Sequence, residues 1–78
     1  MDKYEYRLKA EQIDKLAKKK DYVTAAKIAD TIDWRRVKNL EMLYIVSEIY
    51  EKTERYGECM EILDIAYDRA PVGRMLLY

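Results

Sequence analysis

Apolar residues recur every three or four positions along the chain, a spacing that places them on one face of an α-helix. The first such stretch follows Asp2, whose side chain can cap the first free N–H groups while Glu5 reaches back in a capping box. The second follows Asp21, another residue type that caps helices. The pattern predicts two helices, with apolar stripes formed by Tyr6, Ala10, Ile13, Leu16 and Ala17 in the first and by Tyr22, Ala25, Ala26, Ala29 and Ile32 in the second.

A third helix is predicted to begin near Trp34, with Asp33 as its cap. Its apolar positions form two stripes, which indicates a helix packed between neighbours on two sides. The stripes are Val37, Leu40, Leu43, Ser47 and Tyr50 on one side and Met42, Ile45, Val46 and Ile49 on the other. The pattern lapses over residues 53–55 and resumes at Tyr56, so a fourth helix is predicted that ends before Pro71. The apolar residues after Pro71 look like the opening turn of a fifth helix, and we expect a fragment of a longer protein.

Composition limits the fold class. A chain of 78 residues allows one small domain. With 50% hydrophobic and 38% charged residues, it is neither a disordered chain nor a membrane-spanning one. Two glycines and one proline leave little material for the turns of an all-β fold. We therefore predict a single all-α domain. We expect no membrane partner, because 15 cationic and 15 anionic side chains give no net charge that would attract the chain to an anionic membrane surface.

Residue types that catalysis needs are missing or isolated. Histidine is absent, which removes the usual general base near neutral pH and the commonest metal ligand. Cys59 stands alone, so no internal disulfide forms and we expect a reducing cytoplasm. Gly57 and Gly73 are too far apart for a phosphate-binding loop. We expect no enzyme activity, no cofactor and no metal ion. Interior packing is the expected role of Cys59, Tyr22, Tyr50 and Tyr56.

The chain also repeats itself with a 34-residue period, which aligns Tyr22 with Tyr56, Ala25 with Cys59, Ile28 with Ile62 and Leu16 with Tyr50. Large, small and aromatic residues of the second repeat follow a fixed order in Leu43, Val46, Ser47, Tyr50, Cys59, Leu63, Ala66 and Pro71. On these positions the chain resembles the tetratricopeptide repeat (TPR) family, with Leu43 in place of the motif's tryptophan and Ser47 in place of its glycine. The resemblance is close over residues 40–71 and weaker over residues 6–37.

This resemblance implies a short right-handed α-solenoid of antiparallel helix-turn-helix repeats. It divides the single domain of residues 1–78 into a first repeat at about 6–39, a second at about 40–73 and the start of a third helix pair at 72–78. A plain four-helix bundle is the alternative. It explains four helices equally well but leaves the 34-residue register as a coincidence.

A protein-protein interaction module is the function that the resemblance implies, because the first helices of successive repeats in this family line a groove that holds a peptide or a partner helix. Carried onto this sequence, the groove residues are Arg7, Ala10, Asp14, Ala17, Lys18, Glu41, Tyr44, Glu48, Glu51 and Lys52. The acidic row of Glu41, Glu48 and Glu51 favours a basic or amphipathic segment. The family's carboxylate clamp is excluded, because Ala10, Asp14, Tyr44 and Glu48 replace its lysines and asparagines. Each of these side chains equally suits an ordinary solvated helix face.

A structural, self-assembling element is the second function class. Its self-association residues are Val72, Met75, Leu76 and Tyr78, and a homo-oligomer is expected. Charge is divided along the chain, with eleven Lys and Arg against seven Asp and Glu over residues 1–39 and four against eight over residues 40–78. This asymmetry favours head-to-tail stacking of copies. A nucleic-acid partner for the basic half is the weaker interpretation, since lysines at a helix end complement the helix dipole.

Overall fold

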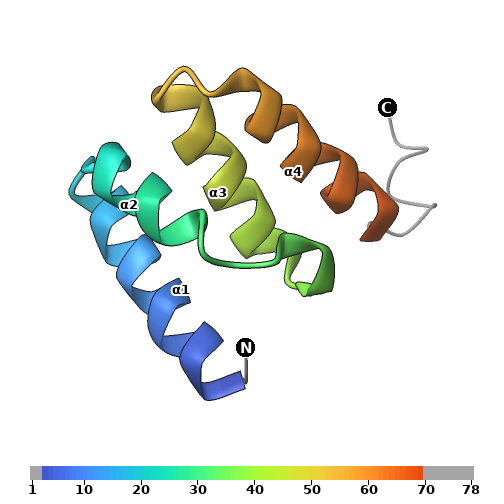
Figure 1. Ribbon diagram of the computed structural model, residues 1–78, viewed down its shortest axis with the longest axis horizontal. Coiled ribbons are helices and arrows are strands. Elements are labelled where there is room, and N and C mark those ends of the chain that lie inside the picture. The colour runs from blue at the N-terminus through green and yellow to red at the C-terminus, as the bar shows by residue number, and fades with distance from the viewer. Residues whose placement is uncertain (1–2, 70–78) are drawn as a thin grey trace.

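The structure, a computed structural model, describes residues 3–69. This part of the chain consists of α1 (Lys3–Lys18), α2 (Tyr22–Ala29), the short 3₁₀ helix η1 (Trp34–Arg36), α3 (Leu40–Lys52) and α4 (Tyr56–Arg69), as Figure 1 shows. Residues 3–69 contain no strand. The predicted all-α class is therefore confirmed for them.

Helix α3 lies between the other helices. α1 pairs with α2 and α3 pairs with α4, while α3 also packs against both helices of the first pair (Figure 1). Leu43, Val46 and Ile49 of α3 are fully buried and form the core together with Ile13 of α1. The two apolar stripes of α3 thus face neighbours on two sides, as predicted. The arrangement of the two pairs as a right-handed solenoid stays a prediction.

The turns inside the two helix pairs use the same backbone hydrogen bonds, displaced by one repeat length. Between α1 and α2, the N–H of Asp21 donates to the carbonyl of Leu16 at 2.9 Å. Between α3 and α4, the N–H of Arg55 donates to the carbonyl of Tyr50 at 2.8 Å. Three further N–H to carbonyl bonds of the first turn recur in the second. Lys19 to Lys15 corresponds to Thr53 to Ile49, Lys20 to Ala17 corresponds to Glu54 to Glu51, and Ala25 to Asp21 corresponds to Cys59 to Arg55. The repetition in the sequence therefore extends to the backbone of the turns.

The predicted start of the third helix near Trp34 is wrong. Asp33 caps only η1, where its carboxylate accepts from the N–H of Arg35 at 3.2 Å. α3 begins later, behind a cap formed by Asn39, whose side chain accepts from the N–H of Met42 at 3.2 Å. An extended segment therefore separates two capped helices where the sequence pattern predicts one.

Trp34 explains this interruption. Its side chain is only 6% exposed, and its indole Nε1–H donates at 2.9 Å to the carbonyl of Ala29, the last residue of α2. The chain must turn back after α2 to bring the indole onto that carbonyl. If one continuous helix ran from Trp34 into α3, the indole would lie too far from the carbonyl of Ala29 to bond it. For the same reason α2 ends at Ala29 and not at Ile32 as predicted, although Ile32 is still buried.

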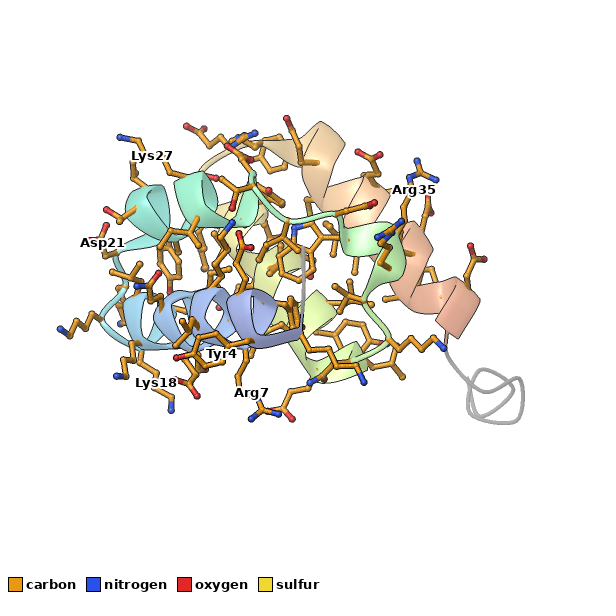
Figure 2. The ribbon with its side chains drawn as sticks, turned by 60° about the horizontal axis from the view of Figure 1, so that its bottom comes forward. Tyr4, Arg7, Lys18, Asp21, Lys27 and Arg35 are labelled. Atoms are coloured by element: carbon orange, nitrogen blue, oxygen red, sulfur yellow. The ribbon has the colours of Figure 1, made fainter. Side chains whose placement is uncertain are left out.

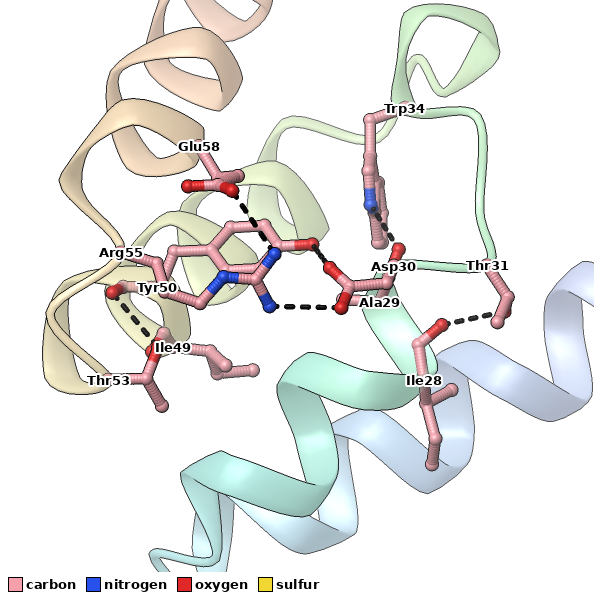
Figure 3. Close-up of polar contacts among 10 residues, drawn as sticks. All are labelled: Ile28, Ala29, Asp30, Thr31, Trp34, Ile49, Tyr50, Thr53, Arg55 and Glu58. Carbon is pink, nitrogen blue, oxygen red and sulfur yellow. Dashed lines mark hydrogen bonds and ion pairs between the residues drawn. The ribbon is translucent and has the colours of Figure 1, made fainter.

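A hydrogen-bonded cluster joins the first helix pair to the second (Figure 3). The carboxylate of Asp30 accepts from the hydroxyl of Tyr50 and from Nη1 of Arg55, each at 2.9 Å. Arg55 also donates to Glu58 at 3.2 Å, and its guanidinium lies 4.9 Å from the centre of the Tyr50 ring. Hydrogen bonding by Arg55 lowers the pKa of Asp30, whereas burial and then Asp30 raise the pKa of Tyr50. We call Asp30, Tyr50, Arg55 and Glu58 the interpair cluster.

The side chains expected in the interior differ in exposure. Tyr50 is buried, and Tyr22 and Cys59 are partly buried and pack against the core. Tyr56 is exposed, so its predicted place in the interior is wrong. The reason is that Tyr56 lies on the face of α4 that points away from α3, where no described element packs. The predicted cap of the first helix, Asp2, and the predicted stop of the fourth, Pro71, lie outside the described residues.

Candidate functional site

Two neighbouring hollows follow the seam between α1 and α3. The first, of about 460 Å³, is lined by Lys3, Tyr6, Arg7, Ala10, Glu11, Asp14, Asn39 and Met42. The second, of about 180 Å³, is lined by Asp14, Ala17, Lys18, Tyr22, Ile45, Glu48 and Ile49. Asp14 borders both hollows, so they form one continuous surface, which we call the α1–α3 groove.

Only some of the predicted groove residues lie in the α1–α3 groove. Those that line it are Arg7, Asp14, Lys18 and Glu48, together with Ala10 and Ala17. Glu41, Tyr44, Glu51 and Lys52 are exposed on α3 but line neither hollow. Figure 2 shows Arg7 and Lys18 projecting on the same side of α1. The predicted self-association residues Val72, Met75, Leu76 and Tyr78 lie outside the described residues.

The floor of the groove is apolar, and its residues are not among the predicted groove residues. Met42, Ile45 and Ile49 of α3 form this floor, and Tyr22 of α2 closes one end. The three α3 residues belong to the second apolar stripe that the sequence predicts for the third helix. A groove floor and a core surface use the same apolar residue types, so the pattern alone does not distinguish them.

Charged side chains border this apolar floor. Asp14 and Lys18, one helical turn apart, form an ion pair with Oδ2 and Nζ 3.1 Å apart. Glu48 enters the same hollow from α3, and its carboxylate has no hydrogen bond or ion pair with any described residue. Arg7 borders the other hollow beside the exposed start of α1. Both hollows therefore have charges of both signs at their edges, and Glu48 is the carboxylate near Ile49 that has no cationic partner among the described residues.

Tyr6 lies at the side of the groove that meets the core. Its ring makes an edge-to-face contact with Trp34, with ring centres 6.4 Å apart. Its hydroxyl oxygen is buried and has no hydrogen-bond partner among residues 3–69. Burial also raises the pKa of this phenol. Tyr6 therefore contributes ring packing while its hydroxyl stays uncompensated.

Reactive groups are few in the described part of the chain. It contains no group of three or more His, Cys, Asp and Glu side chains that could hold a metal ion. Burial, and secondarily the charge of Glu51, raises the pKa of the Cys59 thiol. This thiol is therefore protonated at neutral pH, the less reactive form. None of the described helices combines the length and the apolar character needed to cross a bilayer.

The sequence matches no protein-family model and no curated protein, and no solved structure matches the chain. The resemblance to the TPR family is therefore carried by the motif positions of the second repeat and by the 34-residue repetition.

Proposed function

We propose that the chain is a non-enzymatic protein-interaction module, a TPR-like α-solenoid whose α1–α3 groove binds a peptide or a partner helix. The observation that carries this proposal is the groove, in which Asp14 connects two hollows between the first helices of the two pairs. The repeated turns support equivalent roles for α1 and α3, because equivalent helices of a solenoid face the same side. We place the module in the cytoplasm, since it has a single cysteine.

A basic or amphipathic segment suits the groove best. Ile45, which is only partly buried, offers apolar surface to an aliphatic or aromatic side chain of the ligand. In the same hollow, Glu48 can pair with a lysine or arginine of the ligand without breaking an ion pair with a described residue. Glu41 and Glu51 extend the negative potential along the exposed side of α3. An apolar anchor flanked by cations is therefore the expected recognition motif.

Two labelled peptides test this proposal against the full chain by fluorescence anisotropy: an amphipathic helix with lysines on its polar face, and the same helix with glutamates there. We expect the basic peptide to bind better and its affinity to fall as salt rises. Glu48→Lys should weaken binding about tenfold. Asp68→Lys makes the same charge change on α4, outside the groove, and should leave the affinity within a factor of about two. Equal binding of both peptides, or equal effects of both substitutions, would contradict the proposal.

A self-assembling structural element is the second candidate, favoured by exposed apolar side chains such as Met60 and Tyr67 on α4. In this case copies associate through Val72, Met75, Leu76 and Tyr78, and a homo-oligomer forms. The thermal midpoint should then rise with protein concentration, because association stabilises the folded state. Deletion of residues 72–78 should remove that dependence. A chain that stays monomeric at high micromolar concentration would eliminate this candidate.

A further inference from the structure

The outer face of α4 has an apolar stripe that no described element covers. Tyr56, Met60, Leu63 and Tyr67 follow one another at intervals of four, three and four residues, so they share one face of the helix. Tyr56, Met60 and Tyr67 are 58%, 59% and 54% exposed, and Leu63 is half-buried. The core-facing side of the same helix includes the fully buried Ala66. α4 therefore has two apolar faces, as α3 has, but only one of them is packed within residues 3–69.

The equivalent face of α2 shows what covers such a stripe in this molecule. In the repeat register, Tyr56, Met60 and Leu63 correspond to Tyr22, Ala26 and Ala29. Ala26 and Ala29 are buried, and Tyr22 lies beside Ile45 and Ile49 of α3. On α2 this face is thus covered by a helix, α3, which packs against both α1 and α2.

Beside the apolar stripe of α4 lies a polar residue, Asp64, that also has an equivalent in the first helix pair. It lies one repeat length after Asp30, which accepts hydrogen bonds from Tyr50 and Arg55 in the interpair cluster. Asp30 has helical backbone angles, φ −61° and ψ −19°, so the two aspartates occupy the same place relative to their apolar stripes. The carboxylate of Asp64 is exposed and has no hydrogen bond or ion pair with residues 3–69. Asp30 therefore accepts from two donors where the two helix pairs meet, whereas the carboxylate of its equivalent Asp64 has no donor within the described residues.

We propose that the outer face of α4 is a docking site for a partner helix that covers Tyr56, Met60, Leu63 and Tyr67 with apolar side chains and donates to Asp64 from an arginine, lysine or tyrosine. The two features belong together, because the joint between the two helix pairs of this chain uses both. The site is independent of the α1–α3 groove, which lies on other helices, so either proposal can fail without the other.

A second copy of the chain is a poorer occupant. Added in the 34-residue register, its α1 would take the place of α3, and Leu16 and Asp21 would replace Tyr50 and Arg55. Leu16 has no side-chain donor. Asp21 would bring a second carboxylate toward Asp64, and like charges repel. The chemistry of the face therefore selects a helix of different sequence, with a cation or a hydroxyl where it meets Asp64.

A labelled peptide of residues 38–55 is the probe, because it contains α3 with its cap, Tyr50 and Arg55. Binding to the full chain is measured by fluorescence anisotropy with the peptide at nanomolar concentration, which prevents its self-association. We expect saturable binding that Met60→Lys and Asp64→Lys each weaken about tenfold. Both residues are exposed, and circular dichroism checks that the variants stay folded. The Glu48→Lys variant, altered in the groove, should bind the peptide within a factor of about two of the unmodified chain.

A charge exchange makes the test specific. The peptide carrying Arg55→Glu should bind the unmodified chain poorly and regain most of its affinity for the Asp64→Lys chain. The absence of binding, or binding that neither Met60→Lys nor Asp64→Lys changes, would overturn the proposal. Binding only after Leu76→Ser and Leu77→Ser are introduced would assign the face to the chain's own C-terminal segment. Self-association that Met60→Lys abolishes would assign it to a second copy, and either result also overturns the proposal.

Discussion

Lys20 and Glu54 occupy equivalent positions in the two repeats and adopt the same left-handed backbone conformation, with φ of 64° and 62°. Each follows the end of the first helix of its pair, and each donates its N–H to the carbonyl three residues earlier. Glycine is the residue that reaches this region without steric cost, yet neither position has one. The reversal of the chain is therefore fixed by the helices on either side and not by the residue at its turning point.

Glycine at these two positions should stabilise the protein. Lys20→Gly and Glu54→Gly each remove a left-handed L-residue, and we expect a gain of about 0.5–1 kcal/mol in the free energy of unfolding by urea. Lys19→Gly is the matched control, since Lys19 has no positive φ, and it should cost up to about 1 kcal/mol. Losses of similar size in all three variants would show that the left-handed residues are not strained.

Acid should weaken the interpair cluster. Hydrogen bonding by Arg55 lowers the pKa of Asp30, so the folded protein binds a proton there less readily than the unfolded chain does. The stability that Asp30 confers is complete above about pH 4 and is lost as pH falls through the lower, folded pKa. The thermal midpoint of Asp30→Asn should therefore fall less steeply between about pH 4 and pH 2 than that of the unmodified chain. Asp68→Asn, which alters an exposed carboxylate of α4, should keep the original slope. Identical slopes in all three proteins would exclude this role of Asp30.

The hydroxyl groups of Tyr6 and Tyr50 should have opposite effects on stability. Tyr6→Phe removes a buried hydroxyl that lacks a partner among the described residues and keeps the ring contact with Trp34, so unfolding should cost about 1 kcal/mol more. Tyr50→Phe removes the donor to Asp30, and unfolding should cost about 1–2 kcal/mol less. Chemical denaturation followed by circular dichroism measures both changes. A destabilised Tyr6→Phe protein would mean that this hydroxyl has a partner.

Cys59 should behave as a packing residue. Because burial raises the pKa of its thiol, alkylation by iodoacetamide at pH 8 should be slower than for the same protein in denaturant. Cys59→Ala should change the free energy of unfolding by no more than about 1.5 kcal/mol and leave peptide binding unchanged, since Cys59 does not line the groove. Rapid alkylation of the folded chain would show that the thiol is accessible and reactive.

Local signals in the sequence were sufficient for much of the fold. Asp21 accepts from the N–H of Thr24 at 3.3 Å, as a capping residue at that position should. The lapse in the apolar pattern over residues 53–55 coincides with the turn between α3 and α4. Caps and helical spacing depend on residues within about four positions of each other, and the chain alone displays them.

Contacts between different elements decided what the pattern left open. Asp33 and Asn39 are both good caps, and only the hydrogen bond from Trp34 to Ala29 explains why a 3₁₀ turn follows the first and α3 follows the second. Apolar spacing at Tyr56 marks a helix face but does not say whether a neighbour packs on it. For the same reason the sequence did not predict the groove floor, because apolar spacing does not show which part of a helix face a neighbouring helix leaves uncovered.

The hydrogen bond between the Trp34 indole and the Ala29 carbonyl also joins α2 and η1 into one cooperative unit. The last turn of α2 cannot fray while the buried indole holds its terminal carbonyl, and the indole cannot leave the core without releasing that turn. Opening of α2 and exposure of Trp34 are then a single event. Since Trp34 is the one tryptophan in the sequence, its fluorescence reports this opening.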